Sequence, residues 1–160
     1  MSQVQSRRVA ESMVEMTEIV FPNDANPMGK LMGGRVMHWV DACAAIAAGR
    51  HARTQVVTAS VDQLNFHRPV PVGGVVVLLA SVNYAGHTSM EVGVKVFHED
   101  RTTGQREHVV SAYLTFVSLD GVTGKPRTVA KVVPETEDEK RRYADAERRR
   151  QDRVACRGTK

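Results

Sequence analysis

An alanine-rich apolar stretch at residues 35–48 constrains the fold of this chain more than any other feature of its sequence. The stretch contains no proline and no internal glycine, and Gly49 after it is a favourable residue for ending a helix. Apolar side chains recur at spacings of three and four, and further alanines cover most of the remaining surface. Because a helix that is apolar nearly all round is buried on several sides, this pattern predicts a central helix closely covered by other elements.

Segments with a period of two surround the predicted helix. One imperfect alternation precedes it at residues 14–20, and four follow at residues 57–66, 75–85, 89–99 and 108–120. Short turns separate the last four segments, which predicts an antiparallel meander. The class is therefore α+β, with the helix packed on the sheet or wrapped by it. A chain of 160 residues can form one such domain without disulfides or a structural metal.

The two ends of the chain are more polar than its middle. The first dozen residues are expected to be frayed. Residues 131–160 hold ten basic and seven acidic residues, with the acidic ones first, which complements a helix dipole. We expect a folded body over residues 12–130 and a charged C-terminal helical tail over residues 131–160, packed lightly on the body or partly disordered.

Charge and cysteine content exclude several classes of function. The net charge is +4, and most of the excess lies in the tail, so the body is nearly neutral and offers no broad basic face for duplex nucleic acid. The two cysteines, Cys43 and Cys156, have no metal-ligand or CxxC spacing, so neither a metal site nor a disulfide is expected. The longest apolar stretch is too short for a bilayer and no signal-peptide core precedes it, so we expect a cytoplasmic protein without a membrane partner.

The loop before the central helix carries the first candidate site. Gly33 and Gly34 stand at the predicted helix start, where free N–H groups and the helix dipole suit an anion or a polarised carbonyl oxygen. Two glycines at this place also suit a tight turn or close packing, and the pattern alone favours that structural role. Asn26 in the same loop fits either substrate positioning or ordinary Asn-Pro turn chemistry.

Asp41 is the strongest candidate because it lies among apolar neighbours in the second turn of the predicted helix. A carboxylate there is costly unless it is paired or functional. The alternative is that Asp41 shares a narrow solvated stripe with His38, and periodicity favours neither interpretation. Ser60 and Asp62 lack a nucleophile elbow. Five further histidines show no metal-ligand spacing and are expected at the surface or at strand ends: His51, His67, His87, His98 and His108.

Several ordered motifs resemble the acyl-CoA hydrolase branch of the hotdog-fold thioesterases. They are the loop PNDANPMGKLMGG, the helix MHWVDACAAIAA, the strand TASVDQLNF, the SM-E-V segment after Gly86-His87-Thr88, the strand SAYLTFVSLD and the VPETEDEKRRY tail. The resemblance covers residues 12–145. It implies a hotdog fold, in which a five-stranded antiparallel sheet wraps around one long helix, with residues 12–130 as the hotdog domain.

The resemblance also implies an activity and its residues. The expected reaction is hydrolysis of fatty acyl-CoA to free fatty acid and coenzyme A, with no cofactor, in a homodimer of hotdogs that assembles further into a trimer of dimers. Asp41 would act as base or nucleophile with Asn26 of the facing subunit. The N–H groups of Gly33 and Gly34 would polarise the thioester carbonyl. Coenzyme A would contact the turn formed by Gly86, His87, Thr88 and Ser89.

Two other functions remain open at this point. The first is a hotdog enoyl-CoA hydratase or dehydratase, whose motifs place a catalytic histidine near the helix start; His38 matches that position poorly. The second is a non-catalytic acyl-CoA sensor or scaffold that binds its ligand without hydrolysing it.

Overall fold

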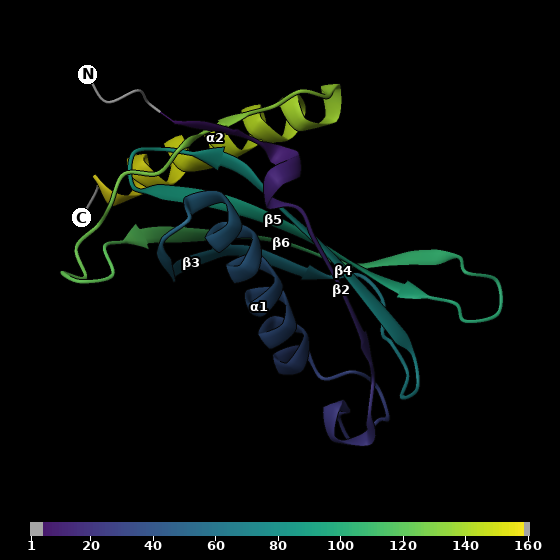
Figure 1. The fold of residues 1–160 in the computed structure, drawn as a ribbon. Helices are drawn as coiled ribbons and strands as arrows, with labels where there is room; N and C mark the ends of the chain where they lie inside the picture. The colour runs from purple at the N-terminus through teal and green to yellow at the C-terminus, as the bar shows by residue number, and fades with distance from the viewer. Residues whose placement is uncertain (1–4, 159–160) are drawn as a thin grey trace.

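A computed structural model describes residues 5–158 as two helices and two sheets, joined by turns and short 3₁₀ segments (Figure 1). In chain order the elements are β1 (Ser6–Arg8), η1 (Val9–Ser12), β2 (Val14–Ile19), η2 (Pro22–Asp24), α1 (Gly33–Ala52), β3 (Gln55–Phe66), β4 (Val75–Ala85), β5 (Ser89–Glu99), β6 (Arg106–Leu119), β7 (Lys131–Val133) and α2 (Glu137–Arg157). The expected α+β hotdog architecture is confirmed, because a five-stranded antiparallel sheet curves around α1.

Helix α1 is longer at both ends than its apolar pattern predicts. It begins at Gly33 and runs through Gly49 to Ala52. The expected stop at Gly49 is wrong: the residue that ends the helix is Arg53, which adopts the left-handed conformation with φ 57° and donates its N–H to the Gly49 carbonyl at 2.9 Å. The extra turn is held by His51, which is fully buried and lies 2.8 Å from the Ala130 carbonyl through Nε2.

The order of strands in the large sheet is β2-β4-β5-β6-β3. Strands β4, β5 and β6 form the expected meander, but β3 does not pair with its successor β4. It crosses to the far side and pairs antiparallel with β6, so that Thr58 lies opposite Phe116 and Phe66 opposite Val110. The prediction of a four-strand meander is therefore wrong for β3. The segment after Phe66 carries the chain from the edge strand β3 across the sheet to β4, which lies next to the other edge strand β2, and β3 forms an open edge.

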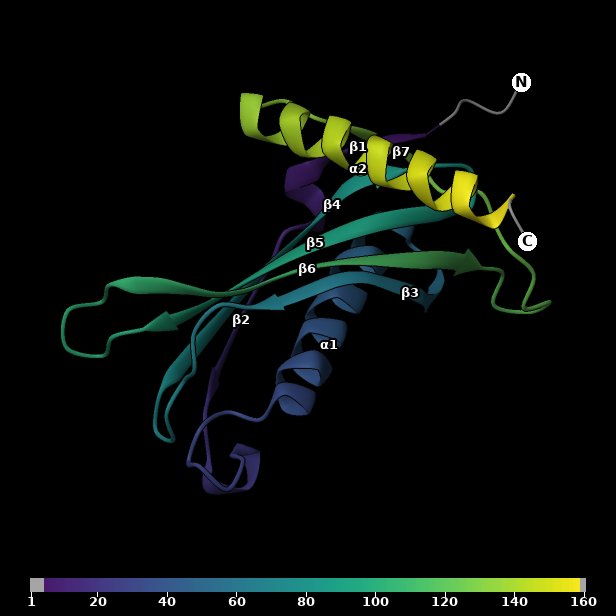
Figure 2. The ribbon, with the colours of Figure 1, turned by 180° about the vertical axis from the view of Figure 1, so that it is seen from behind.

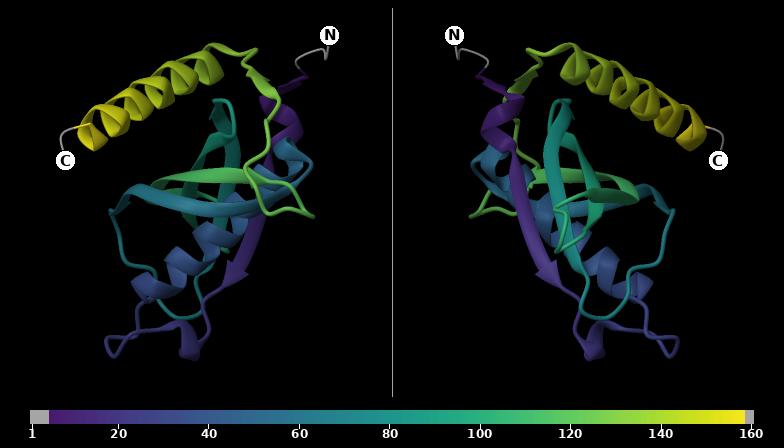
Figure 3. Two further views of the ribbon diagram at one scale, coloured as in Figure 1. Left: turned by 90° about the vertical axis from the view of Figure 1, so that its left-hand side faces the viewer. Right: turned by 90° about the vertical axis from the view of Figure 1, so that its right-hand side faces the viewer.

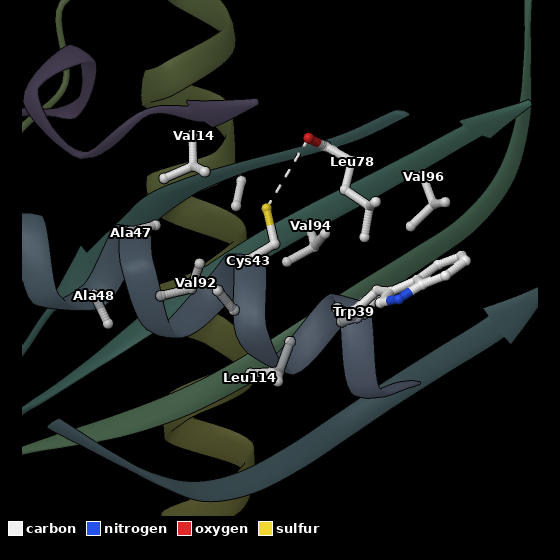
Figure 4. Close-up of a cluster of buried hydrophobic side chains, with 14 of the residues drawn as sticks. Val14, Trp39, Cys43, Ala47, Ala48, Leu78, Val92, Val94, Val96 and Leu114 are labelled. Atoms are coloured by element: carbon white, nitrogen blue, oxygen red, sulfur yellow. Dashed lines mark hydrogen bonds between the residues drawn. The ribbon is translucent and has the colours of Figure 1, made fainter. Parts of the chain in front are cut away.

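The hydrophobic core fills the concave side of the sheet and surrounds α1. Cys43, Ala44, Ala47 and Ala48 are fully buried, and valines and leucines of β2, β4, β5 and β6 close over them (Figure 4). Small side chains allow the sheet to approach the helix backbone, so the Cys43 Sγ reaches the Leu78 carbonyl at 4.0 Å. The predicted burial of this helix is confirmed on its sheet side, whereas Met37 and Ile46 are exposed on the other side.

The N-terminal segment is ordered within the described residues. Strand β1 pairs in parallel with β7, and Val9 and Ser12 of η1 are buried. The Ser12 hydroxyl accepts the Val82 N–H at 2.9 Å and donates to the Val9 carbonyl. The expectation of fraying is wrong for residues 5–12, because this pairing depends on a partner strand far away in sequence; residues 1–4 lie outside the described part.

Helix α2 covers the convex face of the sheet, opposite α1 (Figures 2 and 3). Its start is capped by Thr136, whose hydroxyl accepts the Glu139 N–H at 3.2 Å while the Glu139 carboxylate accepts the Thr136 N–H. Arg149 makes two hydrogen bonds, of 3.0 and 2.7 Å, to the buried carboxylate of Glu91 on β5. Only Glu139 and Ala146 of α2 are buried, so the expected light packing on the body is confirmed. The alternative of partial disorder is wrong for residues 137–157, because a buried charge on the sheet holds the helix. Within residues 5–158, neither helix is apolar enough over its length to cross a membrane.

Candidate active site

Asp41 lies in the middle of α1 and is half buried. Its Oδ1 accepts a hydrogen bond of 2.7 Å from the hydroxyl of Thr58 on β3. Among the described residues nothing donates to its Oδ2, so one oxygen is oriented and the other is available. The expected alternative, a stripe shared with His38, does not describe the contact, because the partner comes from the sheet. Such a carboxylate suits a general base or a nucleophile.

Thr58 is a site residue that sequence analysis missed. Its place in an alternating strand gave no sign of a polar role, because the contact depends on how α1 crosses the sheet. The Thr58 hydroxyl reaches Asp41 on the helix although Thr58, like Val57 and Val61, is exposed on the edge strand β3. The contact between the Thr58 hydroxyl and the Asp41 carboxylate can be recognised only once β3 and α1 are packed together.

Asn26 lies in the loop that leads into α1, and its side chain is held by its own backbone. Its Oδ1 accepts the N–H groups of Met28 at 3.0 Å and Lys30 at 3.1 Å. Gly29, with φ +72°, completes the tight turn by donating to the Asn26 carbonyl. Because two backbone donors occupy Oδ1, the side-chain NH₂ is the group left to face a ligand. The expected turn chemistry is therefore present, and it leaves Asn26 able to act as a donor.

The N–H groups of Gly33 and Gly34 open α1. The next two N–H groups, of Arg35 and Val36, both donate to the Met32 carbonyl, at 2.9 and 3.1 Å. Within the described chain, the N–H groups of Gly33 and Gly34 have no acceptor. A Cβ on Gly34 would meet nothing within 4 Å, so packing does not require a glycine there, whereas a Cβ on Gly33 would lie 3.4 Å from Phe66. The helix start thus presents two free donors beside open space.

A cavity of about 330 Å³ adjoins this loop. Its wall is mostly apolar, with Asn26 and a few cationic groups at its margin; the lining includes Asn26, Leu31, Val36, Phe66, Val70 and Val109. A space of this kind can take an apolar chain with a polar group at one end.

One chain does not bring the two halves of the site together. Asp41 contacts β3 at Thr58, whereas the Asn26 cavity adjoins β3 at Phe66, eight residues further along. At about 3.3 Å per residue these two points are roughly 25 Å apart along the strand. The predicted residues therefore form two separate clusters within a protomer.

The predicted coenzyme A turn lies at the Asp41 end of the sheet. Gly86 donates to the Ser89 carbonyl at 2.8 Å, the Thr88 carbonyl accepts the Ser118 N–H, and the His87 carbonyl accepts the Val129 N–H. Met90 after the turn pairs with Phe116, which in turn pairs with Thr58, so the turn and Asp41 share one level of the sheet. The guanidinium of Arg150 on α2 packs against Gly86, where a Cβ would lie 3.4 Å from its Nε. Sequence analysis missed this arginine because it assigned the helix to solvent.

Other reactive groups do not form a site. Burial raises the pKa of the Cys43 thiol to about 11, which keeps it a neutral core group. His51 is buried, contrary to the expected surface location, and burial lowers its pKa. Among the described residues, no cluster of three His, Cys, Asp or Glu side chains could hold a metal ion.

The chain is similar in sequence to known thioesterases. Residues 28–105 match the model of the thioesterase superfamily. The chain is 45% identical over 135 residues to a Bacillus subtilis protein named as an uncharacterized acyl-CoA thioester hydrolase, YkhA, and this match covers 84% of the chain and 78% of the relative.

Solved structures agree in fold over nearly the whole chain. An asparagine-to-alanine mutant of an acyl-CoA hydrolase from Staphylococcus aureus, in complex with coenzyme A, aligns with a TM-score of 0.92 and 38% identity, covering 97% of this chain and 92% of that one. Aspartate-to-alanine and threonine-to-alanine mutants of the same enzyme align equally well, with TM-scores of 0.91 and 0.90. An apo-hexameric acyl-CoA thioesterase aligns with a TM-score of 0.92 and 38% identity, covering 98% of this chain and 100% of that one.

Proposed function

The chain belongs to the thioesterase superfamily, in its acyl-CoA hydrolase branch, and from this premise we propose that it hydrolyses fatty acyl-CoA with Asp41 and Asn26 as the catalytic pair. It is an acyl-CoA thioester hydrolase. The observation that carries the proposed residues is the Asp41 carboxylate, oriented on a largely buried helix by the Thr58 hydroxyl. The S. aureus enzyme was mutated at an aspartate, an asparagine and a threonine, the three residue types found here at Asp41, Asn26 and Thr58.

Asp41 serves as base or nucleophile. As a base, its available oxygen takes a proton from water while the resulting hydroxide attacks the thioester carbon. The C–S bond then breaks, and Asp41 returns the proton to the departing thiolate of coenzyme A. As a nucleophile, its available oxygen attacks the thioester carbon, the C–S bond breaks and the thiolate of coenzyme A leaves, which gives an anhydride; water then hydrolyses this anhydride to the free fatty acid and the Asp41 carboxylate. In both routes the Thr58 hydroxyl keeps the carboxylate in one orientation.

Asn26 and the N–H groups at the start of α1 donate hydrogen bonds to the thioester carbonyl oxygen. Since the Asn26 Oδ1 is occupied by backbone donors, its NH₂ group donates to the thioester oxygen or to the attacking water. The free N–H groups of Gly33 and Gly34 add two donors at the positive end of α1. Donors aimed at a developing oxyanion each contribute about 10²- to 10³-fold to turnover.

A second copy of the chain completes the site. Strand β3 pairs only with β6 among the described strands, and its open edge carries the exposed side chains of Val57, Val61 and Phe66. If two copies pair antiparallel along this edge, the Phe66 end of one strand meets the Thr58 end of the other. That arrangement unites Asn26 of one protomer with Asp41 of its partner, and the open edge is removed. A trimer of such dimers is the assembly we propose, supported by the hexameric structural relative.

The turn at residues 86–89 is the proposed contact for coenzyme A, with Arg150 beside it as a cation for a phosphate group. The apolar cavity next to Asn26 is proposed to receive part of the acyl substrate. The reaction needs no cofactor in this proposal, since coenzyme A is part of substrate and product. We propose the cytoplasm as its location, supported by Cys43, whose buried thiol is not part of a disulfide.

A thiol-release assay across acyl chain lengths tests the proposal. Asp41→Ala and Asn26→Ala should each lower kcat by at least about 10²-fold. Light scattering should show that the oligomeric state of both variants is that of the wild type. Asn26→Asp is the matched control for Asn26: its carboxylate still accepts the Met28 and Lys30 N–H groups but has no N–H to donate, so it should be as inactive as Asn26→Ala. Wild-type turnover in Asp41→Ala contradicts the proposed residues.

The same preparation separates the alternatives. An enoyl-CoA hydratase would remove the conjugated double bond of an enoyl-CoA, which is followed by its ultraviolet absorbance. A sensor would bind acyl-CoA tightly and release no thiol at any chain length.

A further inference from the structure

The loop that carries Asn26 is joined to the start of α1 by an ion pair between the buried Asp24 carboxylate and the half-buried Arg35 guanidinium. Asp24 is only 6% exposed, and its Oδ1 lies 2.9 Å from the Arg35 Nε. Its Oδ2 accepts the Phe21 N–H at 2.9 Å, and its backbone carbonyl accepts the Met32 N–H at 2.8 Å. Three bonds from one residue therefore join the strand end before the loop, the loop itself and the first turn of the helix.

These bonds connect the two groups of donors proposed for the thioester oxygen. Asn26 follows Asp24 by two residues, and its turn is closed internally by Met28 and Lys30. Gly33 and Gly34 stand between Met32 and Arg35, which are the two helix-side partners of Asp24. The position of the Asn26 NH₂ relative to the two glycine N–H groups thus depends on the contacts of Asp24.

A buried carboxylate is an expensive way to stabilise a loop. The desolvation of a buried ion pair offsets most of its attraction, so such pairs add little to stability while they restrict geometry. The Phe21 N–H alone could be satisfied by an uncharged Asn or Ser at position 24. The negative charge of Asp24 provides, in addition, a directional bond to Arg35 that connects the loop with the helix.

We propose that Asp24 and Arg35 are positioning residues that hold Asn26 at the distance from Gly33 and Gly34 needed for both to bind one thioester oxygen. This inference rests on the proposed role of Asn26. Neither residue touches the substrate. They act through Asn26, and a displacement of about 1 Å at a catalytic group costs up to about 10²-fold in turnover.

A double-mutant cycle tests this role. Asp24→Asn should lower kcat by about 10- to 100-fold in the wild-type background, with KM for acyl-CoA within about twofold. In the Asn26→Ala background the same change should lower kcat no further, because the group it positions is already gone. An equal loss in both backgrounds overturns the inference, since a change that only weakens the fold acts on both alike.

A paired variant controls for folding. Asp24→Asn with Arg35→Gln restores a hydrogen bond between two uncharged side chains, so kcat should recover at least about fivefold over Asp24→Asn alone; no recovery, with thermal unfolding unchanged, overturns the inference. If Asn26→Ala has wild-type turnover, the proposed function of Asn26 fails and this inference fails with it. If Asn26→Ala is inactive but Asp24→Asn is fully active, the proposed function stands and only the inference is wrong.

Discussion

The two long helices are held on opposite faces of one sheet by different forces (Figure 3). Helix α1 is packed by Cys43, Ala44, Ala47 and Ala48, all without exposed surface. Helix α2 is docked by Arg149 on Glu91 and by Arg153 on Asp62, with Arg149 also 3.8 Å from the centre of the Tyr113 ring. The helix that carries the proposed catalytic carboxylate therefore depends on shape, and the helix beside the proposed coenzyme A turn depends on charge.

This difference has consequences for what each helix tolerates. Close apolar packing penalises any added volume. An ionic docking site tolerates volume at its rim but fails when one partner of a buried pair is removed, because the remaining charge is left without compensation. The following changes test this contrast, from the largest expected effect to the smallest.

Glu91→Ala should destabilise the protein by about 3 kcal/mol, the low end for a broken buried pair because Arg149 keeps a side-chain exposure of 25%. Urea denaturation measures this, and proteolysis within residues 137–157 should accelerate. Asp145→Ala is the matched control, since it removes only surface pairs to Arg141 and Arg148 and should cost less than about 0.5 kcal/mol. An equal cost for the two variants would show that α2 is not docked through Glu91.

Ala47→Leu should destabilise the α1 side by about 2 kcal/mol, because three extra carbon atoms have no space in a fully buried position. The same substitution at the exposed Ala144 of α2 should be close to neutral. Thermal unfolding of both variants tests whether shape restricts one helix and not the other. A tolerated leucine at residue 47 would contradict the close packing of α1.

His51 is the charge-sensitive contact of the α1 side. Burial lowers the pKa of His51, opposed in part by the hydrogen bond to the Ala130 carbonyl, with smaller contributions from Arg7, which lowers it, and Glu11, which raises it. Its buried Nδ1 has no hydrogen-bond partner among the described residues. Because the unfolded chain takes up a proton below pH 6.5 and the folded chain resists it, stability is full above pH 6.5. It falls as the pH drops toward the lowered pKa, by at most about 1.4 kcal/mol per pH unit.

Urea denaturation at pH 7.5 and 5.5 measures this effect. His51→Gln keeps a donor for the Ala130 carbonyl without a titrating ring, so its stability should fall less over this interval than that of the wild type. Parallel losses in the two proteins would exclude His51 as the source.

Arg150→Ala should have the smallest effect. The side chain is exposed and packs on the turn at Gly86, so its loss should raise KM for acyl-CoA about two- to fivefold at low salt and leave kcat unchanged. Arg148→Ala, on the same helix but paired with Asp145, is the control and should leave KM unchanged. An unchanged KM in Arg150→Ala would separate α2 from the binding of coenzyme A.

The sequence predicted elements better than it predicted their partners. Strands β4 and β5 have the bounds expected from alternation, because a period of two is a local property. The pairing of β3 with β6 and the burial of His51 were missed, since each depends on contacts with residues more than forty positions away. The candidate site shows the same division: Asp41 and Asn26 stand out by residue type and motif, but Thr58, Asp24 and Arg35 gain their roles only from contacts.

The sequence by itself determined the class of the protein and the chemistry it carries, because periodicity, turn residues and an ordered set of motifs are written along the chain. Only the tertiary structure decided which strands form the edges of the sheet, which hydroxyl orients Asp41 and how a chain end rich in arginine becomes a docked helix. The physical reason is that a carboxylate such as Glu91 looks like a surface residue until a guanidinium closes over it, and one-dimensional patterns do not record which distant groups meet.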